Sequence, residues 1–382
     1  MKKGSRSLNS KGSLEMKKAE ESSVPETGPP SNASNKSSRR RKLPGSPSPV
    51  RENTTGLAIL PDELLLEILS YYPESEPDPN EEYSKEDADA HFARRERLIT
   101  LSQTCRNLRR FLRPYVWRRI EVFTGMRVSA GEVLDNQEKL ALELLRQLEI
   151  VTIRDSELAE YVNVVNVVVE DHHVRNVLRE LTRCLAIFPN MHTLKLDLKI
   201  PAHPFDQVIT YGFGRHKSFP QIRSITLRSY CCASLLRFVP NVRNIYFIAP
   251  KESQPESHLL AYASCCPRLE NIRILVPFNF TQLAARFVEQ FPNIRDLTLQ
   301  FTYGNFTQID LSSISNYRDL KIVRMDVLHP MDSQIWEGYR SQVKDALLDI
   351  QNGDKEEKTI VVRVESQPKE VITLPWPPIF KL

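Results

Sequence analysis

The stretch Phe188-Pro189-Asn190-Met191-His192-Thr193-Leu194-Lys195-Leu196 sets the pattern for most of this chain. It returns closely at Phe291, where Phe-Pro-Asn-Ile is followed by Leu297 and Leu299. The same spacing of three apolar residues occurs six times, at intervals of 20–31 residues. The six sets are Met191/Leu194/Leu196, Ile222/Ile225/Leu227, Val242/Ile245/Phe247, Leu269/Ile272/Ile274, Ile294/Leu297/Leu299 and Leu320/Val323/Met325. Such recurrence predicts stacked copies of one supersecondary unit.

Within each set, apolar residues alternate with other residues, which is typical of a short strand with one buried face. The segments between the sets carry helical periodicity, as in Val174, Val177, Leu178 and Leu181. One strand and one helix cannot bury their apolar faces alone, but stacked copies can. We therefore predict an α/β solenoid over residues 160–365, with parallel strands and with helices on the convex side.

This pattern resembles the leucine-rich-repeat family. The asparagine that the family places shortly after each strand is absent, so the resemblance implies an irregular solenoid. We expect the β-rich stretches at 148–153 and 161–169 to begin the sheet as atypical repeats. Residues 336–347 are expected to form a helix and residues 359–364 a last strand. Pro375, Pro377 and Pro378 favour a cap or a frayed end over residues 366–382.

Alternation along the predicted strands places one column of side chains on the open face of the sheet. The column contains several cations and one aromatic ring, which would suit an acidic or phosphorylated protein segment. A solvated sheet face without a ligand explains the same residues. The candidate target-binding residues are Lys195, Arg228, Tyr246, Arg273 and Arg324.

A second pattern precedes the repeats, in Leu60-Pro61-Asp62-Glu63-Leu64-Leu65-Leu66-Glu67-Ile68-Leu69. Proline at the first helical position followed by two acids is typical of a helix start. The apolar residues after it form one stripe. A second helix is predicted from Leu98 to Leu112, ended by Pro114, and a last short element from Tyr115 to Ile120. Three short helices with so little core of their own are typical of a module that docks on another protein.

Together with Leu101–Arg110 and Val116–Ile120, this stretch resembles an F-box over residues 57–122. The resemblance implies binding to a Skp1-like adaptor and, through it, membership of a cullin-RING ubiquitin ligase. An acidic insertion at 73–95 departs from the family, whose members turn there within a few residues. The combination with repeats and polar tails resembles fungal members. The positions that match the family's adaptor-facing and later consensus residues are Leu60, Pro61, Leu64, Ile68, Leu69, Leu101, Cys105 and Trp117.

Charge and composition divide the remaining chain. Residues 1–50 carry a net charge of +7, and the rest carries −3, so a nucleic-acid partner is not expected. Residues 1–55 contain few aliphatic residues and are expected to be a disordered basic tail. Its cluster Arg39–Lys42 is of the nuclear-import type, although a solvated tail explains it as well. Without a long apolar run we expect no membrane partner, and a location in the nucleus, the cytoplasm or both.

No pattern in the chain indicates catalysis. Cys231-Cys232 and Cys265-Cys266 lack the spacing of zinc sites, and Gly-rich phosphate loops are missing. The cluster Glu170–His173 is better explained as a turn in which Asp171 caps the next helix. Cys105 lies on an apolar stripe and is expected in a core. We therefore predict no catalytic residue, metal or cofactor.

These observations favour a non-catalytic substrate receptor of a Skp1-cullin-F-box ubiquitin ligase, with an unknown protein substrate held by the repeats. Residues 123–159 would then be a connecting segment. The alternative is an F-box interaction or scaffold protein that acts outside a ubiquitin ligase.

Overall fold

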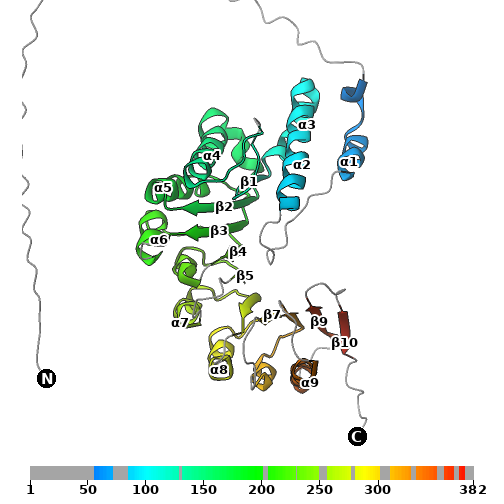
Figure 1. Ribbon diagram of the computed structural model, residues 1–382, viewed down its shortest axis with the longest axis vertical. Helices are drawn as coiled ribbons and strands as arrows, with labels where there is room; N and C mark the ends of the chain where they lie inside the picture. The colour runs from blue at the N-terminus through cyan, green and yellow to red at the C-terminus, as the bar shows by residue number, and fades with distance from the viewer. Residues whose placement is uncertain are drawn as a thin grey trace, which may run out of the picture. The chain divides into compact units, whose positions relative to one another are not determined.

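The computed structural model describes residues 56–71, 85–128, 131–200, 205–228, 230–248, 256–276, 280–301, 310–327, 333–350, 357–364 and 370–374 (Figure 1). The described residues all belong to one compact unit, Glu52–Leu382. The predicted basic tail at 1–55, residues 73–84 of the acidic insertion and the three prolines at 375–378 lie outside them.

Three α-helices follow a short 3-10 turn (η1, Gly56–Ile59) in the first part of the described chain. They are α1 (Asp62–Ser70), α2 (Lys85–Thr104) and α3 (Arg106–Trp117). Two predictions were wrong here. The second helix begins at Lys85 rather than Leu98, so nearly half of the supposed insertion, residues 85–95, is helical. The predicted long helix up to Leu112 breaks at Cys105, whose extended backbone separates α2 from α3.

Local hydrogen bonding explains the break between α2 and α3. The Cys105 sulfur accepts a hydrogen bond from the Leu108 N–H at 3.4 Å and so caps the start of α3. Pro114 was predicted to end this helix, but it lies inside α3. The carbonyl that its missing N–H leaves unbonded belongs to the exposed Arg110, where water can solvate it.

Ten strands form one open sheet in which strand order equals chain order. Neighbours from β1 to β9 are parallel, and β10 pairs with β9 antiparallel. The strands are β1 (Arg119–Val122), β2 (Val164–Glu170), β3 (Thr193–Lys199), β4 (Ser224–Leu227), β5 (Asn244–Phe247), β6 (Asn271–Leu275), β7 (Asp296–Phe301), β8 (Ile322–Val327), β9 (Lys358–Val364) and β10 (Glu370–Leu374).

The apolar sets of the sequence are the interior of this sheet. All eighteen of their residues are at most 3% exposed, and each set places two residues in one strand from β3 to β8. The alternation therefore predicted the strands correctly. Since consecutive strands are parallel, each connection must cross over, which the intervening helices do.

Helices and 3-10 turns connect the strands and lie along one face of the sheet (Figure 1). The predicted helix at 336–347 is confirmed within α9, and the predicted strand at 359–364 within β9. The α-helices are α4 (Gln137–Glu149), α5 (Val174–Leu185), α6 (Phe205–Phe213), α7 (Glu256–Ala261), α8 (Phe280–Gln290) and α9 (Ser333–Asp349). The other helical elements are the π-helical segment η2 (Ile150–Arg154) and the 3-10 turns η3 (Ser156–Tyr161), η4 (Tyr230–Phe238), η5 (Ala263–Cys265) and η6 (Ser312–Asn316).

The two ends of the sheet differ from expectation. The sheet begins at Arg119, inside the predicted third helical element, and residues 148–153 are helical rather than a strand. Leu140, Leu144, Leu148 and Val151 lie three or four residues apart and are all buried, so the helical period determines this segment. At the other end, residues 370–374 of the supposed cap form the edge strand β10.

The Pro-Asn pairs of the repeats have a structural role. Asn241 donates from its side chain to the Pro220 carbonyl at 2.9 Å, and Asn293 donates to the Pro267 carbonyl at 3.1 Å. Each bond joins one turn to the corresponding turn before it.

The turn before α5 corrects another prediction. The residue at the helix N-cap is His173, with φ +49°, and its side chain makes no capping hydrogen bond. Contrary to the prediction, the N-cap residue of α5 is therefore His173 and not Asp171. His173 needs a left-handed backbone to turn the chain from β2 into the helix, which is uncommon for a residue other than glycine.

Candidate functional site

The helices α1, α2 and α3 share a small core that is separate from the interior of the sheet. Leu65 from α1 packs with Leu98 from α2 and with Leu108 and Leu112 from α3, and all four are buried. Half-buried residues around them are Leu60, Leu69, Leu101 and Cys105. Leu65 thus anchors α1 to the pair formed by α2 and α3.

Large apolar side chains remain exposed on and beside α1. Leu64 is 50% exposed, Leu66 45% and Tyr71 74%, and Ile59 in η1 is 56% exposed. A single exposed leucine is ordinary, whereas several on one short helix indicate a surface that another protein covers. Leu64 and Tyr71 are seven residues apart and so lie on one side of α1, and we call this side the α1 apolar surface; Leu66 points to nearly the opposite side.

The structure divides the predicted adaptor-binding residues into three groups. Pro61 and Leu64 are exposed, and Ile68 is half-buried one turn beyond Leu64. Leu60, Leu69, Leu101 and Cys105 pack into the small core. Trp117 lies apart from both groups, because it packs against the core of the sheet. The exposed Leu66 and Tyr71 and the buried Leu65 are missing from the predicted set. The helical angle between neighbours, about 100°, could have separated Leu64 from Leu65 and Leu66.

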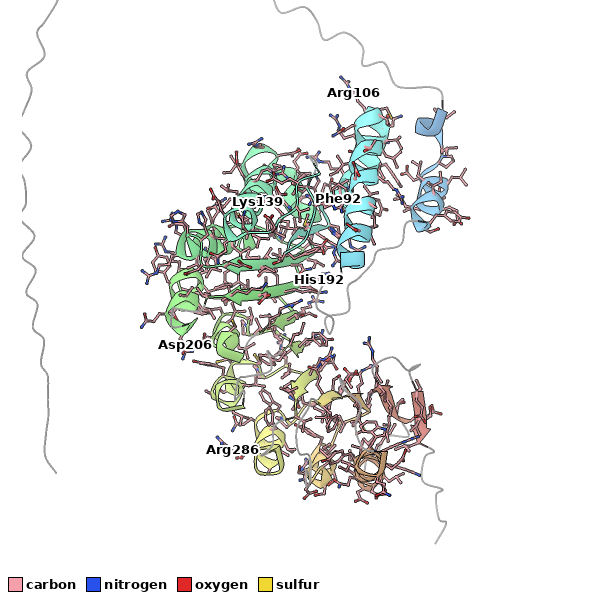
Figure 2. The ribbon with its side chains drawn as sticks, in the orientation of Figure 1. Phe92, Arg106, Lys139, His192, Asp206 and Arg286 are labelled. Atoms are coloured by element: carbon pink, nitrogen blue, oxygen red, sulfur yellow. The ribbon has the colours of Figure 1, made fainter. Side chains whose placement is uncertain are left out.

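A buried charged cluster joins α2 to the first strand. Glu121 in β1 is 3% exposed, pairs with His91 of α2, and lies 2.8 Å from the Arg119 guanidinium. Burial alone would raise the pKa of Glu121, but the hydrogen bonds and charges of His91 and Arg119 lower it to about 2. Figure 2 shows Phe92, the next residue, on the side of α2 toward the sheet. No sequence motif signalled this cluster, because His91 lies 30 residues from Glu121 in the chain.

The predicted target-binding residues do share the open face of the sheet. Lys195, Tyr246, Arg273 and Arg324 lie in one row across β3 to β8 in register. Arg228 follows the end of β4. The row is therefore a real feature of the structure.

Carboxylates on the same face offset the charge of this row. Arg273 pairs with Asp326 at 2.8 Å, Arg324 with Asp296 at 2.7 Å, and Arg228 with Asp197 at 3.7 Å. Tyr246 stands between these pairs, and its pKa is raised by burial and by the charge of Asp296. The arginines are thus bound within the sheet, so the open face is not the free cationic surface that the residue types suggested.

Other site chemistry was sought over the described ranges of the chain. There, no three His, Cys, Asp or Glu side chains are grouped so that they could hold a metal ion. None of the helices described combines the length and apolar character needed to cross a bilayer. Burial raises the pKa of Cys184 to about 11 and that of Cys266 to about 12, which keeps both thiols protonated.

Comparison with known proteins identifies the helical module. A family model described as F-box-like matches residues 57–122, a range that covers α1, α2, α3 and β1. No curated protein matches the chain. The family match, on three helices around a shared core with exposed apolar side chains, makes this chain an F-box protein.

Proposed function

We propose that this chain is the substrate-receptor subunit of a Skp1-cullin-F-box type ubiquitin ligase. The observation that carries the proposal is the α1 apolar surface, because it lies on the F-box-like domain and has no covering element within the described chain. F-box domains typically bind Skp1-like adaptors. Leu64 and Ile68 are one turn apart and would form the centre of the adaptor contact, with Pro61 and Tyr71 beside them.

The sheet would supply the second surface. Its strand order, its parallel pairing and its helices along one face support an irregular leucine-rich-repeat-like solenoid. Such a fold offers an extended open face to a protein segment. Lys195 and Tyr246, which lie in this row and are both half-buried, are the positions at which we look for a target contact.

In this role the chain performs no chemistry of its own. It would hold a target lysine near a conjugating enzyme carried by other subunits, and the gain comes from effective concentration. No catalytic residue is needed for that contribution.

Adaptor binding is tested by a pull-down from cells that express the tagged full-length chain. We expect Leu64→Arg with Ile68→Arg to lose the Skp1-like adaptor and the cullin, since two charges would enter an apolar contact. Leu142→Arg is the matched control, because Leu142 on α4 is 58% exposed but lies outside the F-box. Undiminished adaptor recovery with the double variant would show that the contact is elsewhere.

Substrate reception is tested separately by proximity labelling with and without proteasome inhibition. Targets are the labelled proteins that become more abundant when the proteasome is inhibited in cells with the unaltered chain. The same proteins should become more abundant without inhibition in cells with the Leu64→Arg/Ile68→Arg variant. If the labelled neighbours keep the same abundance in all arms, the chain acts as an interaction protein outside a ligase.

The target face is tested by Lys195→Glu with Tyr246→Ala. We expect targets to be lost while the adaptor is still recovered. If the variant still recovers both the targets and the adaptor, the target surface lies away from this row. Changing Arg273 and Arg324 would be a poorer test, because it would break their ion pairs with Asp326 and Asp296.

A further inference from the structure

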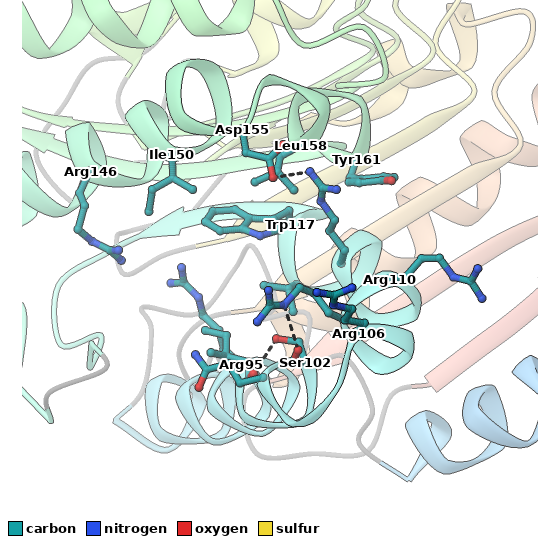
Figure 3. Close-up of a pocket in the computed structure, with 15 residues that line it drawn as sticks. Arg95, Ser102, Arg106, Arg110, Trp117, Arg146, Ile150, Asp155, Leu158 and Tyr161 are labelled. Carbon is teal, nitrogen blue, oxygen red and sulfur yellow. Dashed lines mark hydrogen bonds and ion pairs between the residues drawn. The ribbon is translucent and has the colours of Figure 1, made fainter. Parts of the chain in front are cut away.

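A cavity of about 620 Å³ lies between the F-box helices and the first helical layer of the sheet (Figure 3). Residues of α2 and α3 form one side, and residues of α4, η2 and η3 form the other. This volume is in the range of small-molecule binding sites. Apolar side chains that line the cavity include Trp117, Ile150 and Leu158.

Six arginines line this cavity, together with the polar side chains of Ser102, Gln103, Tyr161 and Asp155. Asp155 is its only carboxylate among the described residues. Against it stand the arginines Arg95, Arg106, Arg109, Arg110, Arg113 and Arg146. Two of them are neutralised locally, since Arg113 pairs with Asp155 and Glu157, and Arg146 pairs with Glu143 at 2.6 Å. The cavity therefore keeps a substantial positive charge.

Arg95 is the central member of the group. Within the described part of the chain its guanidinium makes no hydrogen bond or ion pair, although it is enclosed by α2 and α4. Figure 3 shows Arg95 and Arg146 directed from opposite sides toward the same space beside Trp117, whereas Arg110 is directed away. Arg95 also lines a smaller adjoining cavity of about 200 Å³.

Arg95 is half-buried, and even partial burial of an unpaired guanidinium is unfavourable. Desolvation lowers the pKa of Arg95 despite the attraction of Glu143, and the nearby charge of Arg146 lowers it further. A ligand that brought negative charge between Arg95 and Arg146 would remove this penalty. The forked donors of arginine match phosphate oxygens in particular.

We propose that this cavity binds a small, multiply charged phosphate compound, with Arg95 as its central contact. Arg146 would face Arg95 across the ligand, and Arg106 and Arg109 would hold its outer charges. The ligand would contact α2 and α4 together and so stabilise the junction of the F-box with the sheet. The proposal does not depend on the ubiquitin-ligase role.

The test is a calorimetric titration of the full-length chain with inorganic tripolyphosphate and, in parallel, with orthophosphate. We expect saturable binding of one tripolyphosphate, tighter than that of orthophosphate and weakened by salt. Arg95→Gln should weaken it at least tenfold. Arg97→Gln is the matched control, because Arg97 is an exposed residue of the same helix outside the cavity lining, and should leave binding unchanged.

A second variant is needed in case Arg95→Gln does not fold. Arg106 is exposed at the rim, so Arg106→Gln should fold normally and weaken binding about threefold. Equal binding by the Arg95→Gln, Arg106→Gln and unaltered chains would overturn the proposal. Absence of saturable binding up to millimolar tripolyphosphate would also overturn it, as would a preference for a phosphorylated peptide over tripolyphosphate.

Discussion

Arg273 in β6 and Asp326 in β8 form an ion pair that spans the strand between them. Their Nη2 and Oδ2 atoms are 2.8 Å apart, and both side chains are largely buried on the open face of the sheet. The pair connects two strands that share no backbone hydrogen bonds. It therefore contributes to the alignment of three strands at once.

Removing one partner should leave the other charged and buried. We expect Arg273→Met to lower the free energy of unfolding by about 3–5 kcal/mol, the usual cost of breaking a buried pair. Urea unfolding followed by circular dichroism measures it. The double variant Arg273→Met/Asp326→Leu should recover much of the loss, because it leaves no unpaired charge. A loss for the double variant equal to the sum of the single losses would contradict a direct pairing.

Acid should weaken the junction of α2 with β1. The pKa of Glu121 is about 2 in the folded chain, below its ordinary value of 4.5. Its contribution to stability is therefore complete above about pH 4.5 and is lost as the pH falls toward 2. The shift corresponds to a few kcal/mol at most. The free energy of unfolding, measured between pH 6 and pH 2, should decrease as the pH falls below about 4.5.

The matched variant for the pH series is Glu121→Gln. It should be less stable than the unaltered chain near pH 6 and nearly equal near pH 2, where Glu121 is about half protonated and most of its ionic contribution is lost. A constant difference across the series would mean that packing, and not ionisation, accounts for the effect.

Adjacent leucines in α1 should behave differently. Leu65 is 6% exposed, so Leu65→Ala should cost about 2–5 kcal/mol of local stability through the cavity it leaves. Leu64→Ala should change stability by less than about 0.5 kcal/mol, because Leu64 is half exposed. Amide hydrogen exchange in α2 and α3 reports the difference. Similar protection in the two variants would contradict the burial of Leu65.

Two buried thiols should resist alkylation in the folded chain. With pKa values of about 11 and 12, Cys184 and Cys266 have about one thiolate in a thousand or fewer at pH 8. Mass spectrometry after brief iodoacetamide treatment should find both unmodified, and both modified once urea unfolds the chain. The half-buried Cys265 is the internal reference. Rapid labelling of Cys266 without urea would show that its strand–turn region opens.

The strands and α1 could be predicted from the sequence because each depends on local periodicity, whereas the F-box was predicted from the family resemblance of its residues. Six apolar sets located six consecutive strands, and the Leu-Pro-Asp-Glu start located α1. The break at Cys105 was missed, since an apolar stripe continues across it. The helix at 137–149 was not predicted, because the β-branched residues of 148–153 favour a strand when taken alone.

The sites depend on contacts between distant segments, which periodicity does not contain. By itself, the sequence determined the F-box-like module, the strand positions and the polar row on the open face. Tertiary structure alone decided that Arg273 and Arg324 are paired, that Trp117 faces the sheet, and that Arg95 and Arg146 meet at one cavity. The physical reason is that the charge available to a ligand depends on burial and on partners brought together by folding, and residue type specifies neither.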